Sequence, residues 1–560
     1  MKYKLLLCLA VLLFAPILRA DPLDDLARDF WVWRAAEQPA TGDDVNRVER
    51  PANWLPDWSP AAIEGYRQQL KEFEDRWKKL DVSTQPVPRQ VDYRLMGSAL
   101  ARVRWELEIT RSWQRDPEFY TDQTLGSYFA LLLPPPPFDA DRTRHILATL
   151  DSIPRTLEDA EKNLTQPVGP FARLALAELQ DVRPRLLKSV QELKPALDPT
   201  AGVGVDAITE RAVSSLESYR EWLTQRLPTM AAGTSIGREA YIFFLKNVAL
   251  IPYSPEELLA MGHREWARAV ASQTYEEHRN SNIPPLSLFK DAAQQMAAEQ
   301  KDEIAIRGYL ESKSILSVPA WMQHYRNLPM PGYLSAMGGP GEADDFTGPS
   351  RLKDNGIRYT PSPNPSLGYF ALATAKDPRP LIVHEGVPGH YFQLALGWAN
   401  SDPIRRHYYD SSANEGLGFY AEEMMLHAGL FDDSPHTREI IWNFMRLRAL
   451  RVEVDVKLAL GEFTIDQAAE YLQNTVPMDS ATAHGEAAAF ATTPGQAISY
   501  EIGKLQIYDF LANAQRQKKD TFSLRAFHDF LWRNGNVPIA LQRWEYLGLK
   551  DEVEAVDQLH

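Results

Sequence analysis

The sequence predicts a mainly helical protein with at least two lobes. Apolar and charged residues recur at helical spacing over most of the chain, whereas strand-like patterns are confined to one stretch rich in Gly and Pro. The chain has 560 residues, which is more than one hydrophobic core usually serves. We therefore expect an N-terminal helical lobe at 21–230 and a second lobe at 231–560 that carries the chemistry.

The helices of the first lobe follow from this spacing and from the breaks between them. The proline-rich segment 133–138 and the segment 197–200 are typical turns. The predicted helices are 61–80, 92–111, 142–164, 171–193 and 205–227.

Two helix starts in the second lobe carry explicit capping signals. Ser254 precedes Pro255 and stands three residues before Glu257, the pattern of a capping box with Pro at the first helical position. Thr464 and Gln467 repeat the capping pattern. We expect a helix to begin at each place.

Strands are expected only between residues 328 and 380. Segments 357–359 and 368–372 contain aromatic or β-branched residues and lie among Gly and Pro turns. They predict a small sheet next to the histidine motif that follows.

Residues 1–20 are typical of a secretory signal peptide. Lys2 and Lys4 precede an almost wholly apolar run at 5–17, and Ala20 supplies a small residue before cleavage. An uncleaved anchor is the alternative, although the run is short for a membrane span, which needs about 20 residues. We expect a periplasmic or secreted protein with no stable membrane association after cleavage.

Composition excludes other function classes. The single cysteine, Cys8, lies in this leader, so the mature chain would have neither disulfides nor thiol catalysis. Loss of the leader removes three basic residues and no acid, which moves the formal net charge from −15 to −18. So acidic a protein is not expected to bind nucleic acid. Nothing in the sequence sets the oligomeric state.

The chemistry is concentrated where an apolar run leads into His384, Glu385 and His390. Catalytic zinc is held by neutral imidazole nitrogens, and a nearby carboxylate can serve as base. Metalloproteases usually place the two histidines four residues apart on one helical face. Here they are six apart, which on a regular helix leaves the rings roughly 120° apart.

The residues between the histidines indicate how the rings could still meet. The ring of Pro388 would clash with the carbonyl of residue 384 in a regular helix, and Gly386 and Gly389 tolerate unusual dihedrals. We predict a bulged or broken turn that brings both imidazoles to one ion.

A second carboxylate completes the predicted zinc site. Glu415 follows His390 by 25 residues and stands at the start of a predicted helix. Glu422 and Glu423 compete with it, and either could instead orient a ligand histidine. We predict His384, His390 and Glu415 as ligands of Zn²⁺, with Glu385 as the general base.

The histidine motif and the segment 415–423 resemble the bacterial family called domain of unknown function 885, as do 237–241, 254–258 and 494–503. The resemblance spans most of the mature chain. Members are similar to the mainly helical gluzincin peptidases, which bind zinc through two His and one downstream Glu. The resemblance implies a two-lobed zincin or neurolysin-like fold. It also implies a small β-sheet beside the zinc-binding helix, with an edge strand that pairs with the substrate backbone.

Further candidates have weaker signals. Tyr500 is the candidate oxyanion donor and His484 its alternative, while a structural role for a buried Tyr is equally compatible. Gln393 and Gln496 are candidates for holding the substrate backbone.

Two arginines are candidates for binding a terminal carboxylate. Arg448 and Arg451 could each bind it bidentately, or could pair with Glu453 or Asp455 in the same helix. Many family members carry an Arg-Tyr pair where this chain has Ala489-Phe490, and a His where it has Ala459. These departures indicate a changed specificity or a reduced activity.

The expected function is zinc-dependent hydrolysis of peptide bonds in short peptides, of oligopeptidase or carboxypeptidase type. One alternative is a zinc amidase that acts on cell-wall peptides. Another is a catalytically silent peptide-binding protein on the same scaffold. Side-chain preference and the choice between endo- and exo-cleavage are not indicated.

Overall fold

The computed structural model describes residues 21–40, 48–338 and 343–560. The predicted signal peptide at 1–20 lies outside the described residues. Helices dominate the described part of the chain, and its one regular sheet has three strands. The expectation of a mainly helical protein with a small sheet is therefore confirmed.

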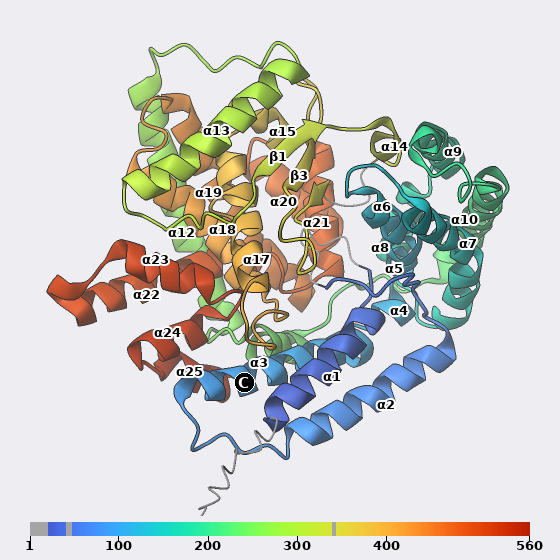
Figure 1. Ribbon diagram of the computed structural model, residues 1–560, viewed down its shortest axis with the longest axis horizontal. Coiled ribbons are helices and arrows are strands. Elements are labelled where there is room, and N and C mark those ends of the chain that lie inside the picture. Colours follow the sequence, from blue (N-terminus) through green and yellow to red (C-terminus); the bar gives the residue numbers. More distant parts are fainter. Residues whose placement is uncertain (1–20, 41–47, 339–342) are drawn as a thin grey trace, which may run out of the picture.

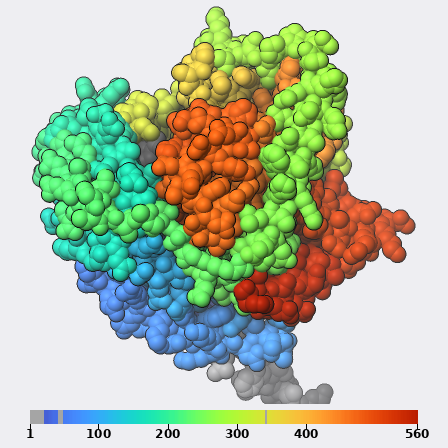
Figure 2. Space-filling model, turned by 180° about the vertical axis from the view of Figure 1, so that it is seen from behind, coloured from blue at the N-terminus to red at the C-terminus, as the bar shows by residue number. Residues whose placement is uncertain are grey.

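The N-terminal helices line the lower and right-hand side of the molecule in Figure 1, and Figure 2 shows them from behind. They are α1 (Pro22–Glu37), α2 (Pro60–Trp77), α3 (Val87–Arg104), α4 (Ser112–Arg115), α5 (Pro117–Thr121), α6 (Ser127–Leu132), α7 (Ala140–Asn163), α8 (Gly169–Glu178), α9 (Val182–Leu193) and α10 (Val205–Arg226).

The remaining elements form the other side of the molecule. They are α11 (Arg238–Phe243), α12 (Pro255–Asn280), α13 (Ala292–Ser312), β1 (Tyr325–Pro329), α14 (Gly332–Ser335), β2 (Asp344–Asp345), β3 (Gly356–Thr360), α15 (Tyr369–Thr374), α16 (Arg379–Leu381), the π-helical turn η6 (Ile382–Gly386), α17 (His390–Trp398), α18 (Ser411–Ala428), α19 (Pro435–Leu460), α20 (Ile465–Thr475), α21 (Ser480–Thr492), α22 (Ile498–Lys518), α23 (Leu524–Arg533), α24 (Ile539–Leu547) and α25 (Asp551–Gln558).

The predicted helices 61–80, 142–164 and 205–227 agree with α2, α7 and α10 to within three residues. The prediction 92–111 starts five residues after α3 and includes the π-helical turn at 105–110, and at 171–193 the structure has two helices. The chain turns between α8 and α9 at Asp181, whose φ is +55°. Pro184 explains the break, because in a continuous helix its ring would clash with the carbonyl of Gln180. Both predicted capping boxes are confirmed, at the starts of α12 and α20.

One predicted strand is wrong. Residues 368–372 begin the short helix α15, in which Tyr369 and Phe370 both pack on Phe444. The carboxylate of Asp479 accepts the backbone N–H of Tyr369 at 3.1 Å and so supports the first turn. Tertiary packing of the two aromatic rings therefore outweighs the strand-like composition.

The predicted strand 357–359 is confirmed as the centre of the sheet. The strand order is β1-β3-β2, with β1 parallel and β2 antiparallel to β3. Glycines let the sheet approach the histidine segment. A Cβ on Gly386 would lie 2.6 Å from the Tyr325 ring, and one on Gly356 would lie 2.6 Å from the Tyr391 ring. The sheet therefore packs directly against η6 and α17, as expected.

The hydrophobic cores do not divide cleanly at residue 230. The largest buried cluster contains most apolar residues of α1–α10, but Tyr333, Ile404 and Leu541 from the second half belong to it as well. Of the three other clusters, one lies wholly in the second half, whereas the other two include Val168 and Phe171 or Trp105 from the first half. No helix among the described residues is long and apolar enough to cross a membrane.

Helices α18 and α22 cross with their backbones almost in contact. A Cβ on Gly503 would lie 2.1 Å from the carbonyl oxygen of Ser412, and one on Gly416 would lie 2.5 Å from the Cα of Gly503. Only glycine fits at this crossing, which sets the position of α18 relative to the core.

We predict that Gly503→Ala lowers the free energy of unfolding by about 1–3 kcal/mol or more, because the added methyl must separate α18 from α22. Gly308→Ala is the matched control, since a Cβ on this α13 glycine meets nothing within 4 Å. It should raise stability by roughly 0.5–1 kcal/mol. Denaturant unfolding of both variants measures the difference, and equal stabilities would contradict the close crossing.

Candidate metal centre

The helix that carries the histidine motif breaks between the two histidines. The turn η6 ends at Gly386, Val387 is extended with φ −129° and ψ 116°, and α17 begins anew at His390. At Gly389 a Cβ would lie 1.6 Å from the carbonyl oxygen of His384, so no other residue fits. The predicted broken turn is confirmed.

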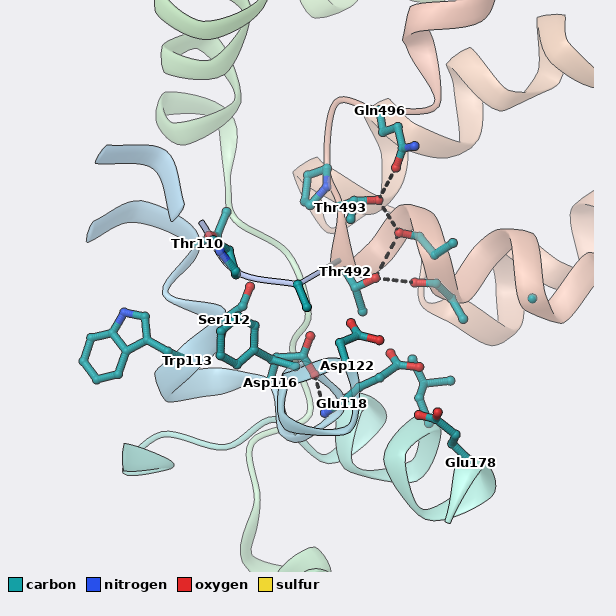
Figure 3. Close-up of a pocket in the computed structure, with 18 of the residues that line it drawn as sticks. Thr110, Ser112, Trp113, Asp116, Glu118, Asp122, Glu178, Thr492, Thr493 and Gln496 are labelled. Carbon is teal, nitrogen blue, oxygen red and sulfur yellow. Dashed lines mark hydrogen bonds between the residues drawn. The ribbon is translucent and has the colours of Figure 1, made fainter. Parts of the chain in front are cut away.

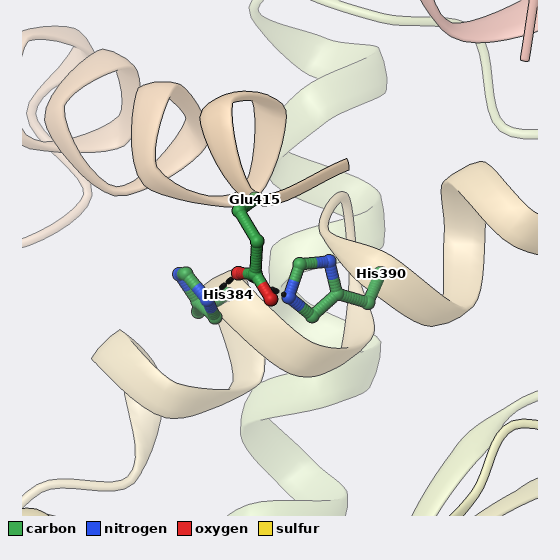
Figure 4. Close-up of side chains that lie close together, drawn as sticks. All are labelled: His384, His390 and Glu415. Atoms are coloured by element: carbon green, nitrogen blue, oxygen red, sulfur yellow. Dashed lines mark hydrogen bonds and ion pairs between the residues drawn. The ribbon is translucent and has the colours of Figure 1, made fainter. Parts of the chain in front are cut away.

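This break brings His384 and His390 together with Glu415 (Figure 4). One ligand atom from each of the three side chains lies within 4.8 Å of the others. Glu415 Oε2 is 3.1 Å from His390 Nε2 and 3.5 Å from His384 Nε2. All three side chains are buried. Two imidazole nitrogens and one carboxylate oxygen thus converge on one point.

Helix α18 places two carboxylates against His384. Glu415 faces its Nε2, and Glu422, two helical turns further on, lies with Oε1 2.7 Å from its Nδ1. Gly418 lies between them, and a Cβ there would be 3.1–3.2 Å from the Cε1 atoms of both histidines. The absent side chain lets α18 approach the rings. Glu422 is therefore placed to orient the candidate ligand His384, one of the two roles left open for it.

The partners of the two candidate arginines lie on other helices. Arg448 Nη2 is 3.2 Å from Glu422 Oε1, and Arg451 forms a bidentate pair with Glu486 at 2.6 and 2.7 Å. The predicted alternative, pairing with Glu453 or Asp455, is wrong. Both acids have other partners: Glu453 pairs with Lys457 and accepts the hydroxyl of Tyr471, and Asp455 is engaged elsewhere.

Asp455 instead joins several of the sequence motifs. Its carboxylate accepts the backbone N–H groups of Gly495 and Ala497 at 2.8–3.1 Å and the hydroxyl of Tyr241 at 3.1 Å. It thereby fixes the segment that leads into α22. Because α22 carries Tyr500, this buried aspartate helps to place that ring beside the histidines.

Contacts between the histidines and the carboxylates shift the pKa values of His384 and Glu415 in opposite directions. Burial lowers the pKa of His384, but its contacts with Glu415 and Glu422 outweigh burial and raise the pKa to about 9. Burial alone would raise the pKa of Glu415, yet the two histidines hold it well below its usual range. Oε1 of Glu415 is buried with no hydrogen-bond partner among the described residues. A cation fits this donor set and would satisfy that orphaned oxygen.

Glu385 lies at the edge of the cluster next to the sheet. Its Oε2 is 4.0 Å from His390 Nε2, and its Oε1 is 3.9 Å from a guanidinium nitrogen of Arg358 on β3. Arg358 also bonds Asp344 on β2 at 2.6 Å, and Asp344 accepts the hydroxyl of Tyr325. The sheet thus holds a cation against Glu385, and the Glu385 side chain keeps 15% exposure.

Tyr500 lies on the other side of His384. The two ring centroids are 6.2 Å apart with an interplanar angle of 13°. The guanidinium carbon of Arg451 lies 4.5 Å from the centroid of the Tyr500 ring. Arg451 therefore helps to position this ring beside His384.

A large cavity lies one helical turn from the cluster. It has a volume of about 1020 Å³, and Ser411 and Gln496 contribute to its wall. We call it the acidic cavity after Asp116, Glu118 and Glu178, which line it opposite Thr492 (Figure 3). The three candidate ligands do not line it. Ser411, however, precedes Glu415 by four residues on α18, a rise of about 6 Å.

The remaining candidates are not brought to the histidines. His484 lines the acidic cavity, with its Nε2 3.5 Å from Asp466 Oδ1 and its side chain 56% exposed. Gln496 accepts the Thr493 hydroxyl at 2.9 Å on the same wall. Gln393 is fully buried, accepts the amide of Asn414 at 2.7 Å and donates to the carbonyl of Ala413. Its geometry is that of a structural residue that holds the start of α18.

Comparison with known proteins places the chain in a family. A family model described as "Bacterial protein of unknown function (DUF885)" matches residues 40–544. The chain belongs to the DUF885 family. No curated protein matches this DUF885 member.

Two solved structures share its fold. One is described as "a putative lipoprotein of unknown function" from Shewanella oneidensis, with 18% identity, a TM-score of 0.69 and coverage of 94% of this chain and 98% of that chain. The other is "the putative lipoprotein" from Colwellia psychrerythraea, with 16% identity, a TM-score of 0.70 and coverage of 96% and 99%. The DUF885 fold is thus shared over nearly whole chains.

Sequence reasoning missed the sheet residues that border Glu385. Arg358 and Asp344 lie about 30 and 40 residues before the motif, on strands whose pairing no local pattern reveals. Glu422 had a usable signal, because it stands two full turns after Glu415 with a glycine between them on the same face. Phe490 lies beneath the guanidinium of Arg451, and Ala489 lies on the wall of the acidic cavity.

We predict that Glu422→Gln weakens the binding of a divalent cation about 10–100-fold, because His384 loses the carboxylate that orients it. The neighbouring Glu423→Gln is the matched control. Glu423 faces away from the cluster and pairs with Arg268 and Lys504, so this variant should lose stability but not metal affinity. Competition titrations against a chelator measure both affinities. Equal losses of metal affinity in the two variants would contradict the assigned role of Glu422.

Proposed function

We propose that this DUF885 protein is a zinc-dependent peptidase of short peptides with a zincin-like active site. The observation that carries the proposal is the convergence of His384, His390 and Glu415, with Glu385 beside them. Zn²⁺ prefers such sets of two imidazoles and one carboxylate, and catalytic sites leave a further position open. In this account zinc, when bound, supplies a Lewis acid that polarises the scissile carbonyl and acidifies water.

The chain's own residues supply the other functions. Glu385 accepts a proton from the attacking water and passes it to the leaving amine. A guanidinium nitrogen of Arg358 lies 3.9 Å from Oε1 of Glu385 and helps to hold this carboxylate in place. Tyr500 aims a phenol O–H at the negative charge that develops on the carbonyl oxygen. Glu422 and Arg448 hold His384 in the orientation that a metal ligand needs.

The proposal extends to location and partners. A periplasmic or secreted peptidase is consistent with the leader-like residues 1–20 and with the description of the two structural relatives as lipoproteins. The acidic cavity of about 1020 Å³ admits a short peptide rather than a folded protein. The two alternatives differ in what they cut. A cell-wall amidase would cut only cell-wall peptides, and a silent binding protein would cut no substrate.

We predict that Glu385→Gln lowers kcat about 10²–10⁴-fold while zinc content stays near one ion per chain, because the base is lost but the ligands remain. Digestion of a peptide library, with metal analysis of the same samples, checks both. Full activity in the variant would exclude Glu385 as the base. Zinc without turnover of any peptide or amide by the unaltered protein would favour the silent binding protein.

We predict that Tyr500→Phe lowers kcat about 10²-fold with little change in KM, because a hydrogen bond formed only in the transition state is lost. Tyr508→Phe on the same helix is the control. The Tyr508 hydroxyl is buried without a hydrogen-bond partner among the described residues and lies two turns further along α22 than Tyr500, so its loss should leave kcat unchanged. A rise in KM without a fall in kcat in Tyr500→Phe would assign Tyr500 to substrate binding instead.

A further inference from the structure

The wall of the acidic cavity carries more acidic than basic side chains. Six acidic side chains but only two arginines line it. Arg185 uses its guanidinium on the backbone carbonyls of Glu178 and Met337, and Arg102 lies over the Phe244 ring. The wall formed by α5 and α8 therefore gathers carboxyl groups that a cationic ligand could ionise and pair with.

Two of these side chains have carboxylate oxygens without a partner among the described residues. Oε1 of Glu178 is buried and makes no hydrogen bond with them, while Oε2 accepts the hydroxyl of Thr121. The carboxylate of Glu118 has no hydrogen bond or ion pair with any described residue. In Figure 3 both residues lie on the cavity wall across from Thr492. Buried polar atoms are normally satisfied, so an unpaired carboxylate oxygen in a cavity indicates a ligand that donates to it.

Electrostatics agree with this geometry. Burial raises the pKa of Asp116 to about 7. Burial, together with the charges of Asp116 and Glu178, raises the pKa of Glu118 well above its usual range. Both effects disfavour the ionised wall when nothing opposes it, and a cation in the cavity would relieve both.

We propose that the acidic cavity binds a cationic group of the peptide substrate, either a Lys or Arg side chain or the free N-terminal amine. The proposal rests on the proposed function and names the class of peptide that the same site selects. Ser411, on the cavity wall, lies one helical turn from Glu415, so one short extended peptide could reach both the cavity and the candidate metal centre.

Binding, rather than turnover, is the direct test. The probes are pentapeptides of alanine with Lys, Gln or Glu at one position, each with a free or an acetylated N-terminus. Their Kd values are measured by calorimetry on the full-length Glu385→Gln protein, so that binding is measured without cleavage of the peptides. The Lys peptide should bind about tenfold more tightly than its Gln counterpart, and the Glu peptide more weakly than both. Loss of affinity on acetylation alone would identify the N-terminal amine as the cationic group.

Variants of the wall provide the second measurement. Glu118→Gln combined with Glu178→Gln should reduce the Lys preference to about twofold or less and leave the Kd of the acetylated Gln peptide unchanged. Glu178→Gln keeps an oxygen that can accept the Thr121 hydroxyl. Glu158→Gln, an exposed change of the same charge on α7, is the control and should keep the full preference. Circular dichroism confirms that each variant is folded.

The outcomes separate this inference from the proposed function. Equal Kd values for all peptides on the folded protein, or an unchanged preference in the double variant, would overturn the cationic site even if peptides are hydrolysed. A Lys preference abolished by the double variant would support the site even if no peptide is cut, in which case the peptidase proposal alone would fail.

Discussion

The position of His384 between two carboxylates of α18 is the contact on which the site depends. Glu415 faces one ring nitrogen and Glu422 the other, and all three side chains are buried. Buried charges are tolerated only when they are paired, and removal of one partner from such a pair typically costs about 3–5 kcal/mol. The imidazole, the helix α18 and the second histidine are therefore held in one mutual arrangement.

Glycines make this contact sterically accessible. Gly418 lets α18 approach both imidazoles, Gly416 and Gly503 let α18 lie directly on α22, and Gly389 lets the broken turn fold back on His384. Each position tolerates no side chain without displacement of backbone or of a ring. The close approach of α18 to its neighbours thus follows from residues that contribute no chemistry, while Asp455 holds the start of α22 in register with them.

The sequence was informative where the determinant is local. The Pro and Gly residues between the histidines predicted the broken turn, the helix periods predicted α2, α7 and α10, and the capping boxes predicted the starts of α12 and α20. It was misleading at 368–372, where packing against Phe444 decides the conformation, and at Arg448 and Arg451, whose partners come from other helices. It could not reveal Arg358 beside Glu385 or the acidic cavity, since both arise from segments that meet only after folding.

The same charges that build the centre extend beyond it. Arg448 links Glu422 to the aromatic ring of Tyr500, and Arg451 places that ring beside His384, so the candidate oxyanion donor and the candidate ligands share one scaffold. X-ray absorption spectroscopy of the zinc-loaded protein tests this account most directly. The account predicts two imidazole nitrogens and at least one carboxylate oxygen at about 2.0–2.2 Å. A coordination shell without imidazole, or the same shell after both histidines are replaced, would contradict it.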